Sequence, residues 1–262
     1  MIALLLPSYR RFRDLFTALS NTPVSPDCKF IVVANYPDEQ LSFLKRLFSK
    51  KALFIDERPY GKGGCYKAYN LAFNLARSEG YEYVALWADD LMPQKNDWLK
   101  EVDELFISPG YLFGIFSTDE CHKRRFGWNF FGGIPCAHFF IAKTRVLGDY
   151  FLNPELNSYV GDNEICVRMM KRNIDITLLP VRLDHNPTEN WIRSNNSKYY
   201  AIDVATFNRI HPELNGLLDD VVLKGDYSSN GAFVADCGKL LHTGEKMDFK
   251  NYEEFMKDLE LK

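Results

Sequence analysis

Short apolar runs and helical stripes alternate along the first third of the chain. Runs with the length and composition of buried strands span residues 2–6, 30–34, 52–55 and 83–88. Between these runs, apolar residues return every three or four positions, which is the period of a helix with one buried face. The helical stripes cover residues 12–19, 41–48 and 68–75. Strands that alternate with helices of this length predict a mostly parallel sheet with helices on both faces.

The pattern changes after residue 97, where a short helix is expected. Further strands are predicted at residues 111–116, 138–142 and 174–181, and helices at residues 162–172 and 199–210. Clustered aromatic residues and glycines at 126–133 indicate irregular strands that line a pocket. The sequence becomes more polar from residue 186, and an amphipathic segment covers residues 252–261. We therefore expect a boundary near residue 190.

Composition narrows the class of protein. The chain has 262 residues, of which 46% are hydrophobic and 26% charged, as in an ordinary globular protein. The net charge of -3 and the scattered Lys and Arg residues argue against a nucleic-acid-binding role. The six cysteines form no CxxC pair, and the apolar N-terminus is too short for a signal peptide. We expect a cytoplasmic protein without a transmembrane segment, and peripheral contact with a membrane surface stays open.

Asp89 and Asp90 stand together directly after the apolar run 83–88. Two neighbouring carboxylates cannot both stay ionised without a cation or a hydrogen-bonding partner. In an open α/β sheet, ligands bind at the carboxyl ends of the strands, and Mg²⁺ or Mn²⁺ can bind carboxylates and phosphates together. The pair therefore favours a metal site, although a turn or a helix cap would explain the same residues. His185 follows the last predicted strand of the sheet, and it either completes this metal site or is a structural histidine.

Two other segments are ambiguous on their residues alone. The glycine-rich segment 61–64 fits neither the P-loop nor the dinucleotide template, so a hinge and a ligand loop both stay open. Asp162 stands at an expected helix start, where a carboxylate can act as a general base, but aspartate is also a preferred cap and the cap is favoured. Glu164 and Arg168 are four residues apart and are expected to form a surface pair. The sequence has no serine-hydrolase, zinc-protease or kinase motif, which leaves transfer chemistry on a nucleotide-linked substrate.

Taken together, the order and spacing of these pieces resemble the GT-A glycosyltransferases, especially the family 2 group of inverting enzymes. The resemblance covers about residues 1–185. The matching segments are residues 6–9 (LPSY), 32–35 (VVAN), 61–70, 88–93 (ADDLMP), 132–142 and 161–164 (GDNE) with Arg168.

The resemblance implies an α/β fold of the GT-A type, with a Rossmann-like, mixed but mostly parallel sheet flanked by helices. Residues 1–190 would form the nucleotide-sugar-binding and catalytic domain, and residues 191–262 a C-terminal helical extension or lid. Asp90 matches the second Asp of the family's Asp-x-Asp motif, while Ala88 replaces the first. Asp162 matches the family's base, with Gly161 where a Glu usually stands.

The implied site has a donor end and an acceptor end. The residues expected to contact the donor are Pro7, Ser8, Tyr9, Asn35, Lys62, Gly63 and Asp89. Asp90 and His185 would bind the Mn²⁺ or Mg²⁺ ion. Asp162 would remove a proton from the acceptor hydroxyl during a single, inverting displacement. The aromatic residues 128–131 would stack on a sugar of the acceptor or belong to the core.

The expected function is the transfer of a sugar from a nucleotide-sugar donor to a hydroxyl of a glycan or another acceptor, as in polysaccharide biosynthesis. Ala88 and Gly161 also suggest a catalytically inactive module that binds nucleotide sugars. A sugar nucleotidyltransferase is a third reading. That class needs a glycine-rich loop directly after the first strand, and residues 7–11 contain no glycine.

Overall fold

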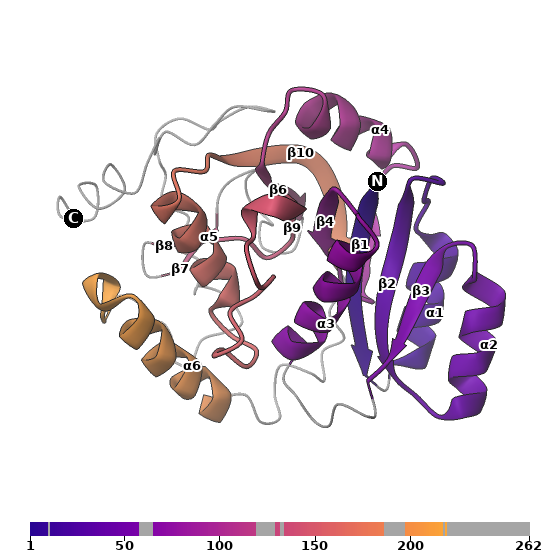
Figure 1. Cartoon of the computed structure of the whole chain (residues 1–262), viewed down its shortest axis with the longest axis horizontal. Helices are drawn as coiled ribbons and strands as arrows, with labels where there is room; N and C mark the ends of the chain where they lie inside the picture. The colour runs from indigo at the N-terminus through magenta and orange to yellow at the C-terminus, as the bar shows by residue number, and fades with distance from the viewer. Residues whose placement is uncertain are drawn as a thin grey trace.

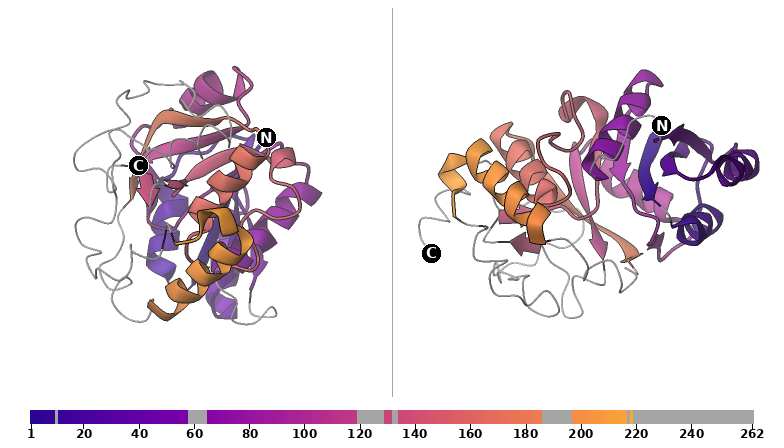
Figure 2. Two further views of the ribbon diagram at one scale, coloured as in Figure 1. Left: turned by 90° about the vertical axis from the view of Figure 1, so that its left-hand side faces the viewer. Right: turned by 90° about the horizontal axis from the view of Figure 1, so that it is seen from below.

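The computed structural model describes residues 1–9, 11–57, 65–118, 129–131, 134–185, 197–216 and 218. In this part of the chain a curved sheet lies at the centre, and helices cover both of its faces (Figure 1, Figure 2). No helix in these ranges combines the length and the apolar character needed to cross a bilayer.

The N-terminal half is a regular alternation of strands and helices. Its elements are β1 (Ile2–Tyr9), α1 (Phe12–Asn21), β2 (Cys28–Asn35), α2 (Asp38–Phe48), β3 (Ala52–Asp56), α3 (Cys65–Ser78) and β4 (Tyr83–Leu86). Strands β3, β2, β1 and β4 are neighbours in that order, and all three pairings are parallel. Helix α3 lies in front of β1 in Figure 1, and α1 lies on the opposite face.

The C-terminal half is less regular. Its elements are β5 (Leu91–Pro93), α4 (Trp98–Val102) with a π-helical turn (Asp103–Ile107), β6 (Phe113–Thr118), β7 (Asn129–Phe131), β8 (Ile134–Cys136), β9 (Phe140–Lys143), α5 (Gly161–Lys171), β10 (Ile176–His185) and α6 (Ser197–Ile210). Strand β9 runs antiparallel between β4 and β6. Strand β10 is parallel to β6 and antiparallel to the edge strand β5. The full order is therefore β3-β2-β1-β4-β9-β6-β10-β5, with β7-β8 as a separate ribbon.

The expected fold class is confirmed: the sheet is mixed, mostly parallel and flanked by helices, and the chain continues into helix α6. The hydrophobic pattern does not predict β5, because three residues are too few to show an alternation. The glycine-rich segment 61–64 and the amphipathic segment 252–261 lie outside the described residues. The division into residues 1–190 and 191–262 stays a prediction.

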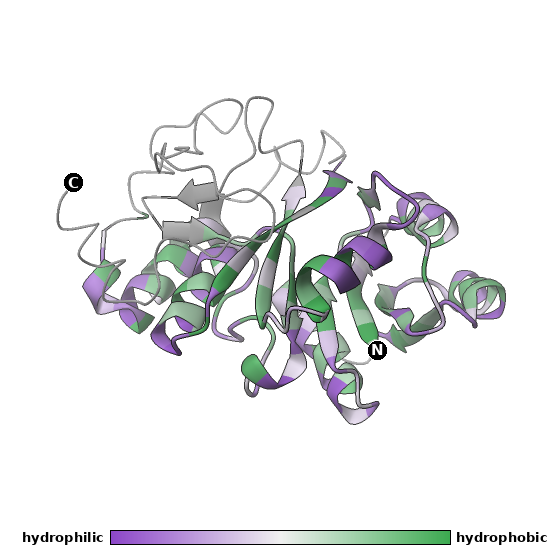
Figure 3. Ribbon diagram, turned by 90° about the horizontal axis from the view of Figure 1, so that it is seen from above, coloured by the Kyte–Doolittle hydropathy of each residue, from purple (hydrophilic) through white to green (hydrophobic). Residues whose placement is uncertain are grey.

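The core lies along the central strands, which are apolar on both sides because helices cover both faces. Figure 3 shows this distribution, with hydrophobic colouring in the sheet and hydrophilic colouring on the outer sides of the helices. Trp87 and Trp98 are fully buried, with ring centroids 5.1 Å apart. Because Trp87 stands two positions before Asp89, core packing holds the strand end from which the acidic pair emerges.

Candidate functional site

The first part of the site lies at the carboxyl ends of β1 and β2. The parallel register puts Ser8 beside Ala34 and Tyr9 beside Asn35. Ser8 is buried, and its hydroxyl donates to Asp89 Oδ2 at 2.6 Å. The Tyr36 hydroxyl lies 2.7 Å from the Ser8 oxygen and must donate to it, because the Ser8 proton is already used. This chain of hydrogen bonds fixes one face of the Asp89 carboxylate.

Arg11 lies between the two aspartates. Its Nη1 atom is 2.7 Å from Asp89 Oδ1 and 3.0 Å from Asp90 Oδ2, and its Nε atom donates to Asp14 at 2.9 Å. Arg11 is not among the site residues predicted from the sequence. The signal was present, because two adjacent carboxylates need a cation and Arg11 follows the same strand end as Ser8.

Burial and charge act in opposite directions on these groups. Burial raises the pKa of Asp89 to about 6, although the Ser8 hydrogen bond and the Arg11 charge work against it. Burial also acts to raise the pKa of Asp90, but the hydrogen bonds and charges of His185 and Arg11 outweigh it and lower that pKa. Burial acts to lower the pKa of Arg11, and the two carboxylates more than offset this and raise it. Asp90 is therefore the more strongly ionised member of the pair.

His185 lies beside Asp90 because its strand, β10, pairs with β5, which the hydrophobic pattern did not predict. In the antiparallel pairing of β10 with β5, His185 lies opposite Leu91, the residue after Asp90. His185 Nε2 lies 3.4 Å from Asp90 Oδ1. The His185 and Phe139 rings pack edge to face, with centroids 5.0 Å apart. The structure thus brings together the two predicted metal ligands.

The donor atoms at this position fit a divalent cation. Two ligands at about 2.1 Å from one ion stand roughly 3 Å apart, and the 3.4 Å between Asp90 Oδ1 and His185 Nε2 is close to that spacing. A carboxylate oxygen and an imidazole nitrogen are common ligands of divalent metals. Asp90 Oδ1 can face an ion while Oδ2 stays with Arg11. The predicted Mn²⁺ or Mg²⁺ therefore remains compatible with these residues.

Asp162 stands at the start of α5 on a strained piece of backbone. The preceding Val160 has φ 51°, a left-handed conformation that is unfavourable for a β-branched residue. Between them, Gly161 donates its N–H to the Tyr66 hydroxyl at 3.0 Å. A Cβ atom at Gly161 would lie 2.5 Å from the Tyr66 ring, so only glycine fits. This packing explains why glycine occupies the position where the resemblance leads one to expect Glu.

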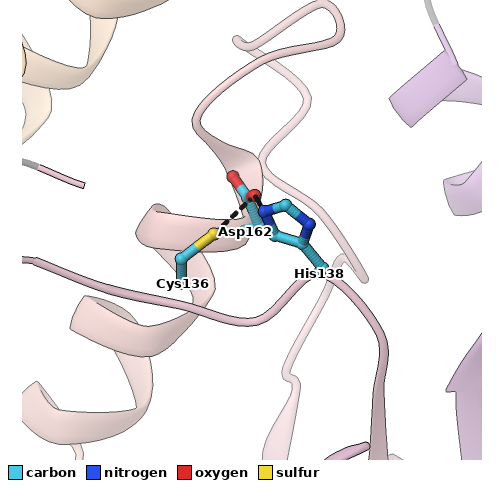
Figure 4. Close-up of side chains that lie close together, drawn as sticks. All are labelled: Cys136, His138 and Asp162. Atoms are coloured by element: carbon cyan, nitrogen blue, oxygen red, sulfur yellow. Dashed lines mark hydrogen bonds and ion pairs between the residues drawn. The ribbon is translucent and has the colours of Figure 1, made fainter. Parts of the chain in front are cut away.

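Cys136 and His138 lie against Asp162 (Figure 4). The Cys136 thiol donates to Asp162 Oδ2 at 2.7 Å, and His138 Nε2 lies 3.4 Å from the same oxygen. Asp162 Oδ1 accepts the backbone N–H of Asn163 at 3.1 Å. The N-cap position of α5 is Val160, and no side chain of the described residues caps this helix, so the expectation that Asp162 is a helix cap is wrong. Neither Cys136 nor His138 is among the site residues predicted from the sequence. A Cys-x-His pair at a strand end was the available signal, but nothing local connects it to residue 162.

Buried polar side chains hold the segment between β9 and α5. Arg168 donates to the carbonyl oxygens of Leu147, Tyr150 and Phe151 at 2.8–3.1 Å. Glu164 lies 3.4 Å from Arg168, and the two residues are only 1% and 6% exposed. The expectation of a surface pair is therefore wrong. The pair faces inward because its cation is needed to satisfy the carbonyls of this segment.

Two further residues fasten the same segment. The Asn70 side chain on α3 donates to the Leu152 carbonyl oxygen at 2.7 Å and accepts the N–H groups of Phe151 and Leu152 at 2.8 and 3.1 Å. Asp203 on α6 is fully buried and accepts the backbone N–H groups of Asn157, Ser158 and Tyr159 at 2.8–3.1 Å. The strained start of α5 is thus supported from two sides, which is how backbone strain persists in a folded protein.

Helix α3 connects the two parts of the site. The Tyr69 hydroxyl donates to the carbonyl oxygen of Trp87 at 2.8 Å, just before the acidic pair. The Tyr66 hydroxyl accepts from Gly161, just before Asp162. Tyr66 and Tyr69 are three residues apart, so their side chains leave the same face of the helix. One turn of α3 therefore contacts the backbone before the Asp89–Asp90 pair through Tyr69, and the backbone before Asp162 through Tyr66.

The remaining predicted donor contacts are placed as follows. Pro7 and Asn35 are half-buried near the ends of β1 and β2, and Tyr9 is 46% exposed beside Asn35. Lys62 and Gly63 lie outside the described residues. The individual role of each predicted site residue stays a prediction.

Neither a protein-family profile nor a curated protein sequence matches the chain. Several solved structures share its fold at low sequence identity. S. aureus TarS 1-349 aligns with a TM-score of 0.52 and 15% identity, over 80% of this chain and 72% of that one. A mannosyltransferase from Pyrobaculum calidifontis, solved with GDP-Man and Mn²⁺, aligns with a TM-score of 0.56 and 14% identity, over 83% and 68%.

A third similar structure is glucosyl-3-phosphoglycerate synthase from Mycobacterium tuberculosis, solved with Mn²⁺, UDP and glucosyl-3-phosphoglycerate. It aligns with a TM-score of 0.53 and 9% identity, over 81% of this chain and 79% of that one. Identities this low establish the fold and not the substrate. The chain therefore has the GT-A-like fold of known glycosyltransferases.

Proposed function

We propose that the protein is a glycosyltransferase that moves a sugar from a nucleotide-sugar donor to an acceptor hydroxyl. The observation that carries the proposal is that side chains of α3 contact the backbone beside the Asp89–Asp90 pair and the backbone beside Asp162. Tyr69 holds the Asp89–Asp90 turn, and Tyr66 holds the backbone next to Asp162. The fold is shared with a mannosyltransferase and a glucosyl-3-phosphoglycerate synthase, and on this fold the acidic turn would be the metal-binding edge and Asp162 the base.

The donor end would be the edge formed by β1, β2 and the Asp89–Asp90 turn. Asp90 and His185 would hold Mn²⁺ or Mg²⁺, and the bound ion would supply positive charge to the diphosphate as it leaves. Two of the three similar structures, the mannosyltransferase and the glucosyl-3-phosphoglycerate synthase, were solved with Mn²⁺. Arg11 Nη2 is buried and has no hydrogen-bond partner among the described residues, so it can donate to a phosphate oxygen. Tyr9 and Asn35 remain accessible for the nucleoside.

Ser8 and Asp89 would act by positioning the rest of this edge. The Ser8 hydroxyl is already engaged with Tyr36 and Asp89, so it holds the acidic turn in place. Asp89 in turn orients Arg11 through the 2.7 Å contact with Nη1. Arg11 can then balance the charge of Asp90 and of the incoming diphosphate.

The acceptor end would centre on Asp162. The acceptor oxygen would form a bond to the anomeric carbon as the bond from that carbon to the diphosphate oxygen breaks. The acceptor proton would pass to the Asp162 carboxylate, and the electron pair would leave with the nucleoside diphosphate. A single displacement of this kind inverts the anomeric configuration. The segment fastened by Asn70, Arg168 and Asp203 would keep the carboxylate in place.

The proposal is tested by incubating the protein with UDP-, GDP- and TDP-sugars and Mn²⁺, and by following release of nucleoside diphosphate. We expect release from at least one donor. The Asp162→Asn variant should bind that donor as tightly as the wild type but lose transfer. Binding without any release would support the inactive module, and release of pyrophosphate from a sugar phosphate and a nucleoside triphosphate would support the nucleotidyltransferase reading.

A further inference from the structure

Asp162 lies beside a cysteine and a histidine that a proton transfer to its carboxylate does not require. Cys136, His138 and Asp162 offer a sulfur, an imidazole nitrogen and a carboxylate oxygen that all lie within 4.8 Å of one another. Within the described ranges, these residues are the only group of three such side chains that could hold a metal ion. A general base needs only the carboxylate and a solvent path.

We propose that Cys136, His138 and Asp162 form a second metal site, selective for Zn²⁺ or a similar transition ion. Thiolate and imidazole ligands favour such ions, whereas Mg²⁺ and Mn²⁺ prefer oxygen ligands. The site therefore differs in chemistry from the edge formed by Asp90 and His185. Three protein ligands would leave the fourth tetrahedral position to water or to a small ligand.

The spacing of the ligand atoms suits this assignment. In a tetrahedral zinc site the ligand atoms stand roughly 3.5 Å apart. His138 Nε2 and Asp162 Oδ2 are 3.4 Å apart, which needs almost no change. Cys136 Sγ and Asp162 Oδ2 are 2.7 Å apart, in a contact in which the thiol donates to the carboxylate. An ion that replaced the thiol proton, which would leave to solvent, would need the two atoms to separate by less than about 1 Å.

The backbone around the three ligands is held in place. The N–H of Ala137 donates to the Asp162 carbonyl oxygen at 3.0 Å, which fixes the loop after β8 against the start of α5. Asp162 Oδ1 is held by the Asn163 N–H, so Oδ2 is the oxygen that faces the sulfur and the imidazole. The side chains of His138 and Asp162 are 30% and 27% exposed, and an ion can therefore enter from solvent.

Occupation of this site would have a consequence for transfer. The ion would bind the carboxylate oxygen of Asp162, and the carboxylate could no longer accept a proton from the acceptor. Zn²⁺ would then inhibit the enzyme without displacing the ion at Asp90. This consequence rests on the proposed role of Asp162 as the base, whereas the metal site itself does not.

Co²⁺ is the probe for the test, because a thiolate ligand gives a charge-transfer absorption in the near ultraviolet. The wild-type chain and the Cys28→Ala variant, which lacks a buried thiol of β2, are expected to show this band. Cys136→Ser should lose it, and His138→Ala should weaken Co²⁺ binding by at least about tenfold. His138 is partly exposed, so its variant provides a test that does not depend on replacing a buried residue.

The proposal would be overturned by a Cys136→Ser variant that keeps the wild-type band, or by Co²⁺ affinity that is unchanged in His138→Ala. A second arm adds Zn²⁺ to the Mn²⁺-loaded protein during transfer. Inhibition in the wild type supports both the site and the base. Tight Zn²⁺ binding with unchanged transfer supports the site but removes Asp162 as the base. Absence of turnover at every condition counts against the proposed function alone, because the Co²⁺ spectrum needs no turnover.

Discussion

At the scale of single residues, the site depends on side chains that fix other side chains. Asp89 is held by Ser8 and by Arg11, and it is less easily ionised than its neighbour because it is buried. Asp90 keeps its charge because His185 and Arg11 both face it. The surroundings of the two neighbouring aspartates thus raise the pKa of Asp89 and lower that of Asp90.

Gly161 is the residue whose replacement tests the packing around Asp162. A methyl group in Gly161→Ala would meet the buried Tyr66 ring at 2.5 Å, and we expect overpacking to lower the free energy of unfolding by about 2 kcal/mol. Urea denaturation measures this loss. The same Gly161→Ala change made in a Tyr66→Leu background should cost less stability, because the shorter leucine side chain leaves room for the methyl group. A Gly161→Ala variant as stable as the wild type would show that Tyr66 does not confine this position.

The residue scale also shows what the sequence could not reveal. Asp162 became a candidate base through the family resemblance, which covers the segment around it, and no such resemblance pointed to its neighbours. Cys136 and His138 reach it from a different strand end, 24–26 positions away in the chain. Arg11 could have been suspected from the need for a cation beside two carboxylates. Its actual contact with both of them depends on how β1 and β4 lie side by side.

At the scale of elements, hydrophobic periodicity was sufficient for the long strands and helices, because each buries one or two faces of regular spacing. It failed for β5, whose three residues show no period. That failure matters for the site, because the pairing of β5 with β10 is what brings His185 to Asp90. Short edge strands are defined by register with a distant partner, and a local pattern contains no information on that register.

Helix α6 is expected to stabilise the segment before α5 through Asp203. The Asp203→Ala change would leave three backbone N–H groups without their acceptor, and it should cost about 3 kcal/mol or more. Hydrogen exchange at residues 157–159 should become faster in this variant. Glu155→Ala is a matched control, because it removes the exposed Arg209–Glu155 pair between the same helix and the same segment and should cost at most about 1 kcal/mol. Equal losses in the two variants would contradict the anchoring role of Asp203.

The end of α6 also predicts a pH dependence of stability. Burial, together with the charge of Lys171, lowers the pKa of His211 to about 4, while Glu213 acts in the opposite direction and Arg168 adds to the lowering. The Lys171 Nζ atom lies 2.8 Å from His211 Nδ1, and the Phe207 ring packs against the imidazole. The folded protein therefore keeps this imidazole neutral, whereas the unfolded chain binds a proton below about pH 6.5. Stability from this group is complete above pH 6.5 and is lost as the pH falls toward 4.

The His211→Asn variant measures this contribution. Between pH 7 and pH 5 the wild type should lose about 2 kcal/mol more stability than the variant, because only the wild type can bind the additional proton on unfolding. Denaturant unfolding at the two pH values gives the comparison, and the cost of the substitution itself cancels in the difference. Equal losses in the two proteins would show that His211 is not the group responsible.

At the scale of the whole molecule, one helix organises the two ends of the site. Helix α3 packs on the central strands and presents Tyr66 and Tyr69 toward the backbones that carry Asp162 and the acidic pair. The segment between β9 and α5 is then secured by groups on α3, α5 and α6. The acidic pair and Asp162 are thereby held in a fixed relation by one helix.

The most direct test of this account is a calorimetric titration of UDP, GDP and TDP into the protein, with and without Mn²⁺. We predict that at least one of them binds and that Mn²⁺ strengthens its binding. Replacement of Asp90 by Asn should weaken the Mn²⁺-dependent binding by at least about tenfold, or about 1.4 kcal/mol, and Asp162→Asn should leave it unchanged. No binding of any of the three in the presence of Mn²⁺, or equal binding by the wild type and Asp90→Asn, would contradict the account.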